Sequence, residues 1–231
     1  MTKLEILQKE ITGCNLCPRL RAHCREVARV KRRAYLDWEY WGKPVPSFGD
    51  PKARLLIIGL APGAHGANRT GRMFTGDKSG DWLFRAMHET GFASQAESVS
   101  RGDGLELKDA YICASARCAP PDNKPLPEEV RACRPYLARE LALLPNVRAV
   151  MALGRLAFDN YLTHLRDNGE IESRASFAFG HGLVHDLTPP LICSYHPSQQ
   201  NTSTGKLTAA MLREVFDLAR VVVEGCGEGT P

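Results

Sequence analysis

Short apolar runs alternate with segments of helical periodicity along most of the chain. Runs of five to seven mainly apolar residues are typical of buried strands, and they occupy 54–60, 110–116, 147–153 and, at the end of a stretch of short strand candidates (176–195), 191–195. Apolar residues at helical spacing predict helices over 79–90, 127–144, 156–165 and 207–223. Because a helix between two strands lets them run parallel, this order predicts a three-layer α/β/α fold around a mainly parallel four-stranded sheet.

Composition and length are those of an ordinary globular protein. The chain has 231 residues, 43% hydrophobic and 24% charged, which excludes disorder, collagen and coiled coil. No repeat divides it, so we expect one domain over 1–231 with an N-terminal, cysteine-bearing helical extension of about residues 1–50. No apolar run approaches the ~18 residues of a membrane span, and the N-terminus lacks the pattern of a secretory signal. We therefore expect a cytoplasmic monomer without a membrane partner.

Positive charge is concentrated in one segment. The net charge is only +4, but residues 19–33 carry seven Lys or Arg and one Glu. Such a segment is either the solvated face of a helix or a contact for nucleic-acid phosphates, and charge alone leaves both interpretations open.

Eight cysteines are too few for a disulfide scaffold at this length, so metal ligation is the first use to consider. Cys14 and Cys17 form a CxxC pair, and Cys118 and Cys133 lie far downstream. Four thiolates satisfy the ligand count of a tetrahedral zinc ion or of an iron–sulfur cluster, and their spacing does not choose between these. The remaining cysteines are interpreted as small buried hydrophobes or tail thiols: Cys24, Cys113, Cys193 and Cys226.

A glycine-rich loop, residues 59–80, follows the first predicted strand. Its glycines let backbone amides approach a ligand at the carboxyl end of a parallel strand, where sites of α/β proteins lie. The segment GRMFTGDKS within it almost matches a phosphate-binding P-loop, but Asp77 separates Gly76 from Lys78 and no strand leads directly into it. We therefore reject a nucleotide triphosphatase.

A second polar loop, residues 196–207, follows the last predicted strand. His196 is the first polar residue after that strand, so we expect its imidazole to lie near the glycine-rich loop at the same edge of the sheet. An imidazole there can donate a hydrogen bond to a developing anion whether it is neutral or charged.

Together these loops resemble the signature pair of the uracil-DNA glycosylase superfamily, and the similarity is closest to its family-5, or type b, enzymes. It rests on four segments and covers roughly residues 12–215: YWGKPVPSFGD, GLAPGAHGANRTGRMFTGDKSG, RCAPPDNKP and HPSQQNTSTGKLT. The resemblance implies a uracil-DNA glycosylase-like fold and a 4Fe-4S cluster on Cys14, Cys17, Cys118 and Cys133. It also implies a monofunctional hydrolase that removes uracil, and other deaminated bases such as hypoxanthine and xanthine, from double-stranded DNA in base excision repair.

This chain departs from the better-known branches of the superfamily at the first motif. It has Leu60 and Ala61 where those branches carry an acidic or amide residue. The resemblance assigns catalysis instead to Asp77 and Asn123, as in family 5. Ala114 stands where family 4 has a uracil-reading asparagine, which implies a pocket that tolerates several deaminated bases.

Loss of a deoxyribose–base bond produces a cationic sugar and an anionic base, so charge stabilisation should dominate catalysis. We expect His196 to donate to the departing base, Asp77 to orient water, and Phe74 to stack on the everted base. Further contacts to the base or to phosphate are expected from Gly59, Ala61, Gly63, Ala114, Asn123, Ser198, Arg69, Arg72 and Lys206.

Each assignment has a structural alternative. Asp77 would also serve as the N-cap of the helix near Ser79, Phe74 as a core residue and Asn123 as a turn residue. For the aromatic residues Trp38, Tyr40 and Trp41, packing is favoured over stacking on DNA. The alternative function is a non-catalytic, metal-stabilised nucleic-acid-binding module, which the missing first-motif carboxylate favours.

Overall fold

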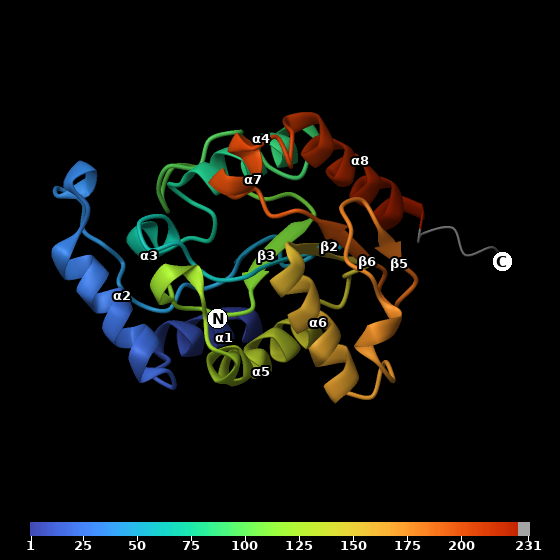
Figure 1. Ribbon diagram of the computed structural model, residues 1–231, viewed down its shortest axis with the longest axis horizontal. Coiled ribbons are helices and arrows are strands. Elements are labelled where there is room, and N and C mark those ends of the chain that lie inside the picture. The colour runs from blue at the N-terminus through green and yellow to red at the C-terminus, as the bar shows by residue number, and fades with distance from the viewer. Residues whose placement is uncertain (226–231) are drawn as a thin grey trace.

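The sheet at the centre of the molecule has six strands in the order β1-β3-β2-β4-β6-β5 (Figure 1). The computed structural model describes residues 1–225. Four strands pair in parallel, and the two short edge strands are antiparallel. Their bounds are β1 Phe48–Gly49, β2 Leu55–Gly59, β3 Ala110–Ala114, β4 Ala149–Leu153, β5 Val184–His185 and β6 Leu191–Ser194.

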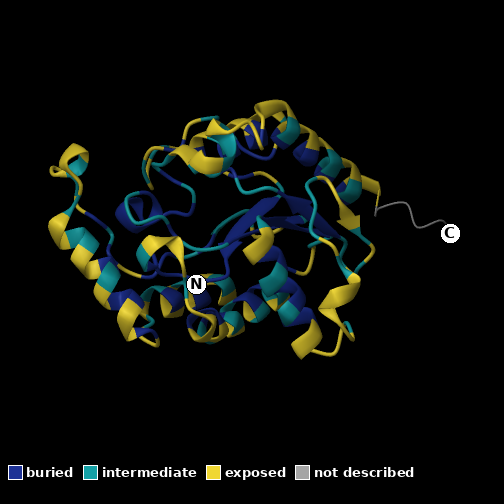
Figure 2. Ribbon diagram, viewed as in Figure 1, coloured by how far each residue is buried: buried dark blue, intermediate teal, exposed yellow. Residues whose placement is uncertain are grey.

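Alternate residues of the parallel strands enter separate cores on the two faces of the sheet. Leu55 and Ile57 pack into the core with helices α4 (Lys78–Glu89) and α8 (Ala209–Gly225). Leu56 and Ile58 face the opposite core with α5 (Pro127–Leu143) and α6 (Arg155–Asp167). Figure 2 shows the strands buried between these helices. Burial of both faces explains why each strand reads as a continuous apolar run.

Three of the connections at the carboxyl edge of the parallel strands contain short helices. The link from β2 to α4 contains α3 (Ala67–Thr70), and the link from β3 to α5 contains the 3₁₀ turn η2 (Pro121–Asn123). The link from β6 to α8 contains α7 (Gln199–Ser203). These are the loops whose motifs the sequence singles out, and the parallel sheet brings them together.

The N-terminal residues form α1 (Lys3–Gly13), α2 (Pro18–Val30) and the 3₁₀ turn η1 (Arg33–Tyr35). A capping box between Thr2 and Glu5 begins α1, which packs against α5. Its Gln8 side chain donates to Glu140 at 2.8 Å, and Glu140 is paired with the fully buried Arg117. A remaining 3₁₀ turn, η3 (Arg174–Ser176), lies between α6 and β5.

The predicted three-layer α/β fold is confirmed, with one correction to the sheet. The four parallel strands and their flanking helices lie within a few residues of the predicted bounds, but the sheet has six strands instead of four. The two additional strands contain only two residues each. β5 lies within the predicted stretch of short strand candidates, 176–195, whereas β1 was not predicted, because two residues are too few to show periodicity. Within residues 1–225, no helix is long and apolar enough to cross a membrane.

Candidate active site

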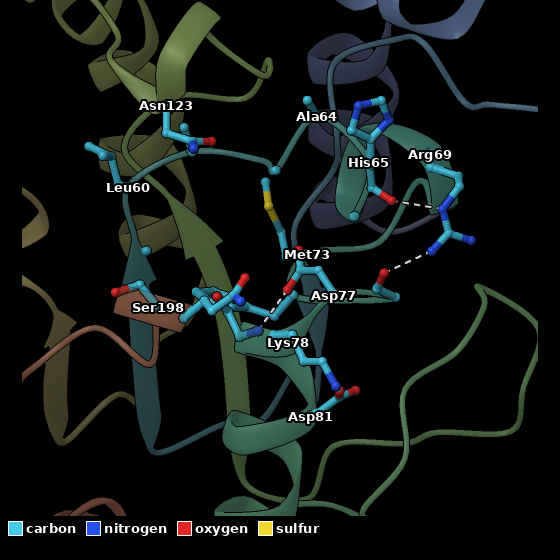
Figure 3. Close-up of a pocket in the computed structure, with 18 of the residues that line it drawn as sticks. Leu60, Ala64, His65, Arg69, Met73, Asp77, Lys78, Asp81, Asn123 and Ser198 are labelled. Carbon is cyan, nitrogen blue, oxygen red and sulfur yellow. Dashed lines mark hydrogen bonds and ion pairs between the residues drawn. The ribbon is translucent and has the colours of Figure 1, made fainter. Parts of the chain in front are cut away.

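A cavity of about 1120 Å³ opens where the three loops meet (Figure 3). Both residues expected to perform the chemistry, Asp77 and His196, line it. It is also lined by most of the residues expected to contact the base or phosphate, but not by Arg72 or Lys206: Gly59, Ala61, Gly63, Arg69, Phe74, Ala114, Asn123 and Ser198. The fold therefore brings residues from three separate segments to one cavity.

Asp77 is the N-cap of α4 and also faces the cavity. One carboxylate oxygen, Oδ1, accepts from the backbone N–H groups of Ser79 at 3.0 Å and Gly80 at 3.1 Å. The other oxygen, Oδ2, lies over the glycine-rich loop, because a Cβ on Gly63 would be 3.0 Å from it and a Cβ on Gly66 would overlap it. Capping and catalysis therefore do not compete for Asp77, since each can use a different oxygen.

Burial raises the pKa of Asp77, while the hydrogen bonds from Gly80 and Ser79 oppose that rise. The surrounding protein replaces water that would otherwise stabilise the carboxylate. A partly desolvated carboxylate is a stronger base and a closer electrostatic partner for a cation than a hydrated one.

His196 presents a neutral imidazole to the cavity. Burial lowers its pKa to about 4, and Nδ1 is buried without a hydrogen-bond partner. Two neighbours position His196. The Asn201 side chain donates to its backbone carbonyl at 2.8 Å. Gly154, with φ of +93°, packs closely against it, since an added Cβ would be 3.0 Å from the Cβ of His196. A neutral ring can still donate one hydrogen bond to a developing anion.

Phe74 covers the end of β2. Its ring lies against Gly59, where an added Cβ would be 2.9 Å from the Phe74 Cζ atom. The centroids of the Phe74 and His196 rings are 5.8 Å apart. Its φ of +54° is unusual for a residue with a side chain. The ring is only partly buried, so it forms a flat apolar wall beside the imidazole.

Asn123 and Ser198 lie at the rim of the cavity. Asn123 is exposed and has a φ of +56°, in the turn of η2 after β3. The Ser198 hydroxyl caps α7 by accepting from the Asn201 N–H at 3.3 Å, which leaves its own proton available to a ligand. Ala114 closes the cavity beneath them, at the end of β3.

Two arginines predicted to contact phosphate are buried instead. Arg72 forms an ion pair with Asp103 at 2.7 Å and donates to Thr75 and Ser98. Arg69 donates to the carbonyls of His65 and Gly76 (Figure 3) and lies against the rings of Tyr35 and Trp38. Their side chains hold the loop together, so the prediction of backbone charge is wrong for both.

The basic segment 19–33 is divided between internal contacts and solvent. Arg21 is buried and donates to the Gly42 carbonyl, and Arg19 pairs with Glu129. Arg25, Arg32 and Arg33 are exposed and form no ion pair with residues 1–225. Part of the segment therefore remains available to a polyanion.

The four cysteines predicted as metal ligands do not line this cavity. Cys14 ends α1, Cys17 precedes α2, Cys118 follows β3 and Cys133 lies in α5. Burial raises the pKa of Cys17 to about 11, and the nearby Cys133 and Cys14 contribute to that rise.

The remaining cysteines do not extend this group into a metal site. Cys24, Cys113 and Cys193 are buried as predicted, while Cys226 lies outside the described residues. Across residues 1–225, no group of three or more His, Cys, Asp or Glu side chains is close enough together to hold a metal ion.

The structure adds two residues that the sequence did not assign to the cavity wall. His65 lines it, with Nδ1 3.0 Å from the Tyr40 hydroxyl, and Arg32 lines it near that pair. Trp38 also lines the cavity as it packs on Arg69, whereas Trp41 packs on Gly71. Only contacts between distant segments could reveal these positions.

Comparison with known proteins gives consistent matches over most of the chain. The family model described as the uracil DNA glycosylase superfamily matches residues 46–220. A type-5 uracil-DNA glycosylase of Thermus thermophilus is 49% identical over 92% of this chain and 94% of its own. A type-5 uracil-DNA glycosylase of Pyrobaculum aerophilum is 45% identical over 89% and 87%. A type-4 uracil-DNA glycosylase of the same organism is 30% identical over 84% and 83%.

Proposed function

Because this chain belongs to the uracil DNA glycosylase superfamily, we propose that it hydrolyses the N-glycosidic bond of uracil in double-stranded DNA, the first step of base excision repair. The observation that carries the proposal is the shared cavity, in which the free oxygen of Asp77 and the neutral ring of His196 face one space. The type-5 relatives, similar over nearly their whole length, support the same activity.

The reaction separates charge, and the two side chains match the two charges. As the bond breaks, the sugar becomes cationic and the base leaves as an anion. Asp77 Oδ2 would hold the attacking water, accept its proton and stabilise the cation, while His196 would donate to the base. Because the imidazole is neutral, it stabilises the departing base by a hydrogen bond and not by a full positive charge.

The everted base would be held by stacking and by backbone groups. Phe74 supplies a flat wall, and stacking of a base on an aromatic ring is worth about 1–3 kcal/mol. Asn123 has both a donor and an acceptor for a base edge. The Ala114 side chain has no polar group that could select uracil by hydrogen bonding, so we propose that hypoxanthine and xanthine are also substrates.

Contacts to the DNA backbone would come from exposed groups around the cavity. The Ser198 hydroxyl proton is available to a phosphate, and Lys206 is exposed on the loop after α7. Arg25, Arg32 and Arg33 would attract the duplex without reading its sequence. We propose that the protein acts as a monomer, and a cytoplasmic location stays a prediction.

A duplex with a single uracil tests the function. Excision followed by alkali should cut the uracil strand at that position, and an undamaged duplex should remain intact. Parallel duplexes with hypoxanthine or xanthine test the wider substrate range. If the protein binds the duplex but leaves the uracil strand uncut, the alternative function holds: a non-catalytic binding module, which the lack of a carboxylate at Leu60 and Ala61 favours.

We also propose that Cys14, Cys17, Cys118 and Cys133 hold a 4Fe-4S cluster. Thiolates are the ligands that such clusters use, and Cys133 lies near enough to Cys17 and to Cys118 to raise the pKa of each. A four-iron cluster is larger than one ion and needs its sulfur ligands farther apart. Bound there, it would supply a cross-link between the α1–α2 turn and α5.

Elemental analysis separates the two metal alternatives. Protein purified without oxygen should contain iron and acid-labile sulfide in a ratio near one and be brown. Zinc without sulfide would contradict the cluster.

A further inference from the structure

The imidazole of His65 has no part in the chemistry proposed above, although it lines the same cavity. Figure 3 shows its ring on the side of the loop away from Asp77. Arg32, Tyr35 and Trp38 line this end of the cavity. The ring is therefore placed at the mouth of the site, close to exposed positive charge.

Two hydrogen bonds define the protonation of the His65 ring. The buried Tyr40 hydroxyl lies 3.0 Å from Nδ1, and the backbone N–H of Arg32 donates to that hydroxyl at 3.4 Å. The Tyr40 oxygen thus accepts from Arg32, and Nδ1 is the acceptor that residues 1–225 offer its proton. We assign the Tyr40 hydroxyl as the donor to Nδ1, because no other acceptor for its proton lies within residues 1–225, and this assignment puts the ring proton on Nε2.

The charges around His65 favour this neutral form. Burial lowers its pKa, and the positive charges of Arg32 and Arg69, together with His23 on α2, lower it further. Nε2 has no hydrogen-bond partner within residues 1–225 and is not among their fully buried unpartnered atoms. An N–H donor at Nε2 would therefore be accessible to a ligand from solvent.

We propose that the Nε2–H of His65 and the guanidinium of Arg32 bind one backbone phosphate of the DNA strand that carries the damaged nucleotide. The inference rests on the glycosylase function proposed above. A phosphate oxygen accepts from a neutral N–H, and its charge is attracted to an arginine that forms no ion pair with residues 1–225. This contact sets the register of the strand over the cavity and reads no base.

A matched pair of variants isolates the Nε2 donor. In His65→Gln, the side-chain amide can place a donor near the position of Nε2, whereas the shorter His65→Asn side chain reaches only the position of Nδ1. We expect His65→Asn to weaken binding about tenfold, the loss typical of one hydrogen bond to a charged group, and His65→Gln to restore much of it. Thermal unfolding of both variants checks that the fold is intact.

The binding probe is a duplex with one 2′-fluoro-2′-deoxyuridine, which resists hydrolysis. In a series of these duplexes, one phosphate at a time near that nucleotide is replaced by an uncharged methylphosphonate. One replacement should weaken binding of the natural protein about tenfold more than it weakens binding of His65→Asn, which keeps only the Arg32 contact to that phosphate. If every replacement weakens both proteins equally, His65 contacts no phosphate.

Salt dependence separates the neutral donor from the cation. Loss of one charged phosphate contact lowers the slope of log affinity against log salt by about 0.9, so Arg32→Gln should show that change. His65→Asn should weaken binding with the slope unchanged, and an altered slope would contradict a neutral ring. If the natural protein neither binds nor cuts uracil DNA, the proposed function itself fails, and this phosphate site fails with it.

Discussion

Asp77 uses its two carboxylate oxygens for different purposes, and this division can be tested by substitution. Asparagine keeps an oxygen for the cap but removes the charge, so Asp77→Asn should lower the single-turnover rate of uracil excision by about 10²-fold or more. Its melting temperature should stay close to that of the natural protein. Asp77→Ala should lose the cap as well, at a cost of about 1 kcal/mol in the free energy of unfolding.

The rate should also depend on pH through this side chain. The ionised form of Asp77 is the active one, and burial raises its pKa. Excision should therefore decline on the acid side with a midpoint above the ordinary aspartate value of about 3.9. An Asp77→Asn variant as active as the natural protein would remove the carboxylate from the mechanism.

His196 links the site to acid stability. Its pKa is about 4 in the folded protein, so between pH 6.5 and 4 the unfolded chain takes up a proton that the folded chain does not. The folded state therefore loses stability as pH falls through this range. His196→Gln cannot titrate and should lose less stability between pH 7 and pH 5, as measured by urea unfolding.

His88 is exposed on α4, and His88→Gln provides the control for this comparison. If both variants lose as much stability as the natural protein, His196 is not the group that titrates. Excision by the natural protein should meanwhile not depend on protonation of His196 above about pH 5, since its ring stays neutral there.

At the scale of elements, the glycine-rich loop approaches the start of α4 closely because Gly63 and Gly66 have no side chains. A Cβ on Gly66 would overlap Oδ2 of Asp77, and the backbone of Gly66, with φ of −96° and ψ of −104°, lies outside the helical and extended regions. Gly66→Ala should therefore displace the carboxylate. The excision rate should fall by a larger factor than the loss in the free energy of unfolding would account for. Single-turnover assays and urea unfolding measure the two effects.

Gly102 provides the matched control, because its added Cβ would meet nothing within 4 Å. Gly102→Ala should leave excision unchanged. An equal rate for Gly66→Ala would show that the loop moves to accept the methyl group, and that Asp77 does not depend on this close approach.

Hydrophobic patterning predicted the elements that contribute to the two cores, and missed those that do not. The parallel strands and the long helices have apolar sides that periodicity reveals. Helices α3 and α7 have four and five residues, and their sequences, ANRT and QQNTS, are largely polar. Such short helices are set by the loops around them, not by a periodic apolar face.

The motifs predicted which residues share one cavity, but they did not predict which arginines are buried. The motif residues Asp77, His196 and Asn123 all reach the cavity. Arg72 was assigned to phosphate because arginines are usually exposed, yet its ion pair with Asp103 lies inside the protein. That partner is thirty-one positions away, and only the folded chain shows that the two residues meet.

At the scale of the whole molecule, the proposed cluster would connect the α1–α2 turn to α5. Loss of one ligand should release the proposed cluster and with it the link between the α1–α2 turn and α5. Cys17→Ser should therefore lose iron and its brown colour, and should unfold at a lower temperature than the natural protein. Absorbance, iron content and thermal unfolding measure these changes.

Cys193→Ala is the control, since this buried thiol lies in β6 and outside the group of four. It should keep its iron and lose only a little stability. A Cys17→Ser protein that retains a full complement of iron would exclude Cys17 as a ligand.

The double use of Asp77 also constrains how this chain can diverge. A residue at position 77 has two requirements to meet: it must cap α4, and in the proposed mechanism it must activate water. Asparagine or serine can cap the helix but cannot activate water as a carboxylate does. A duplicated copy that is no longer selected for DNA repair could therefore replace Asp77 by asparagine or serine without losing its fold. Such an inactive descendant would be identified by the residue at position 77 and not by its overall structure.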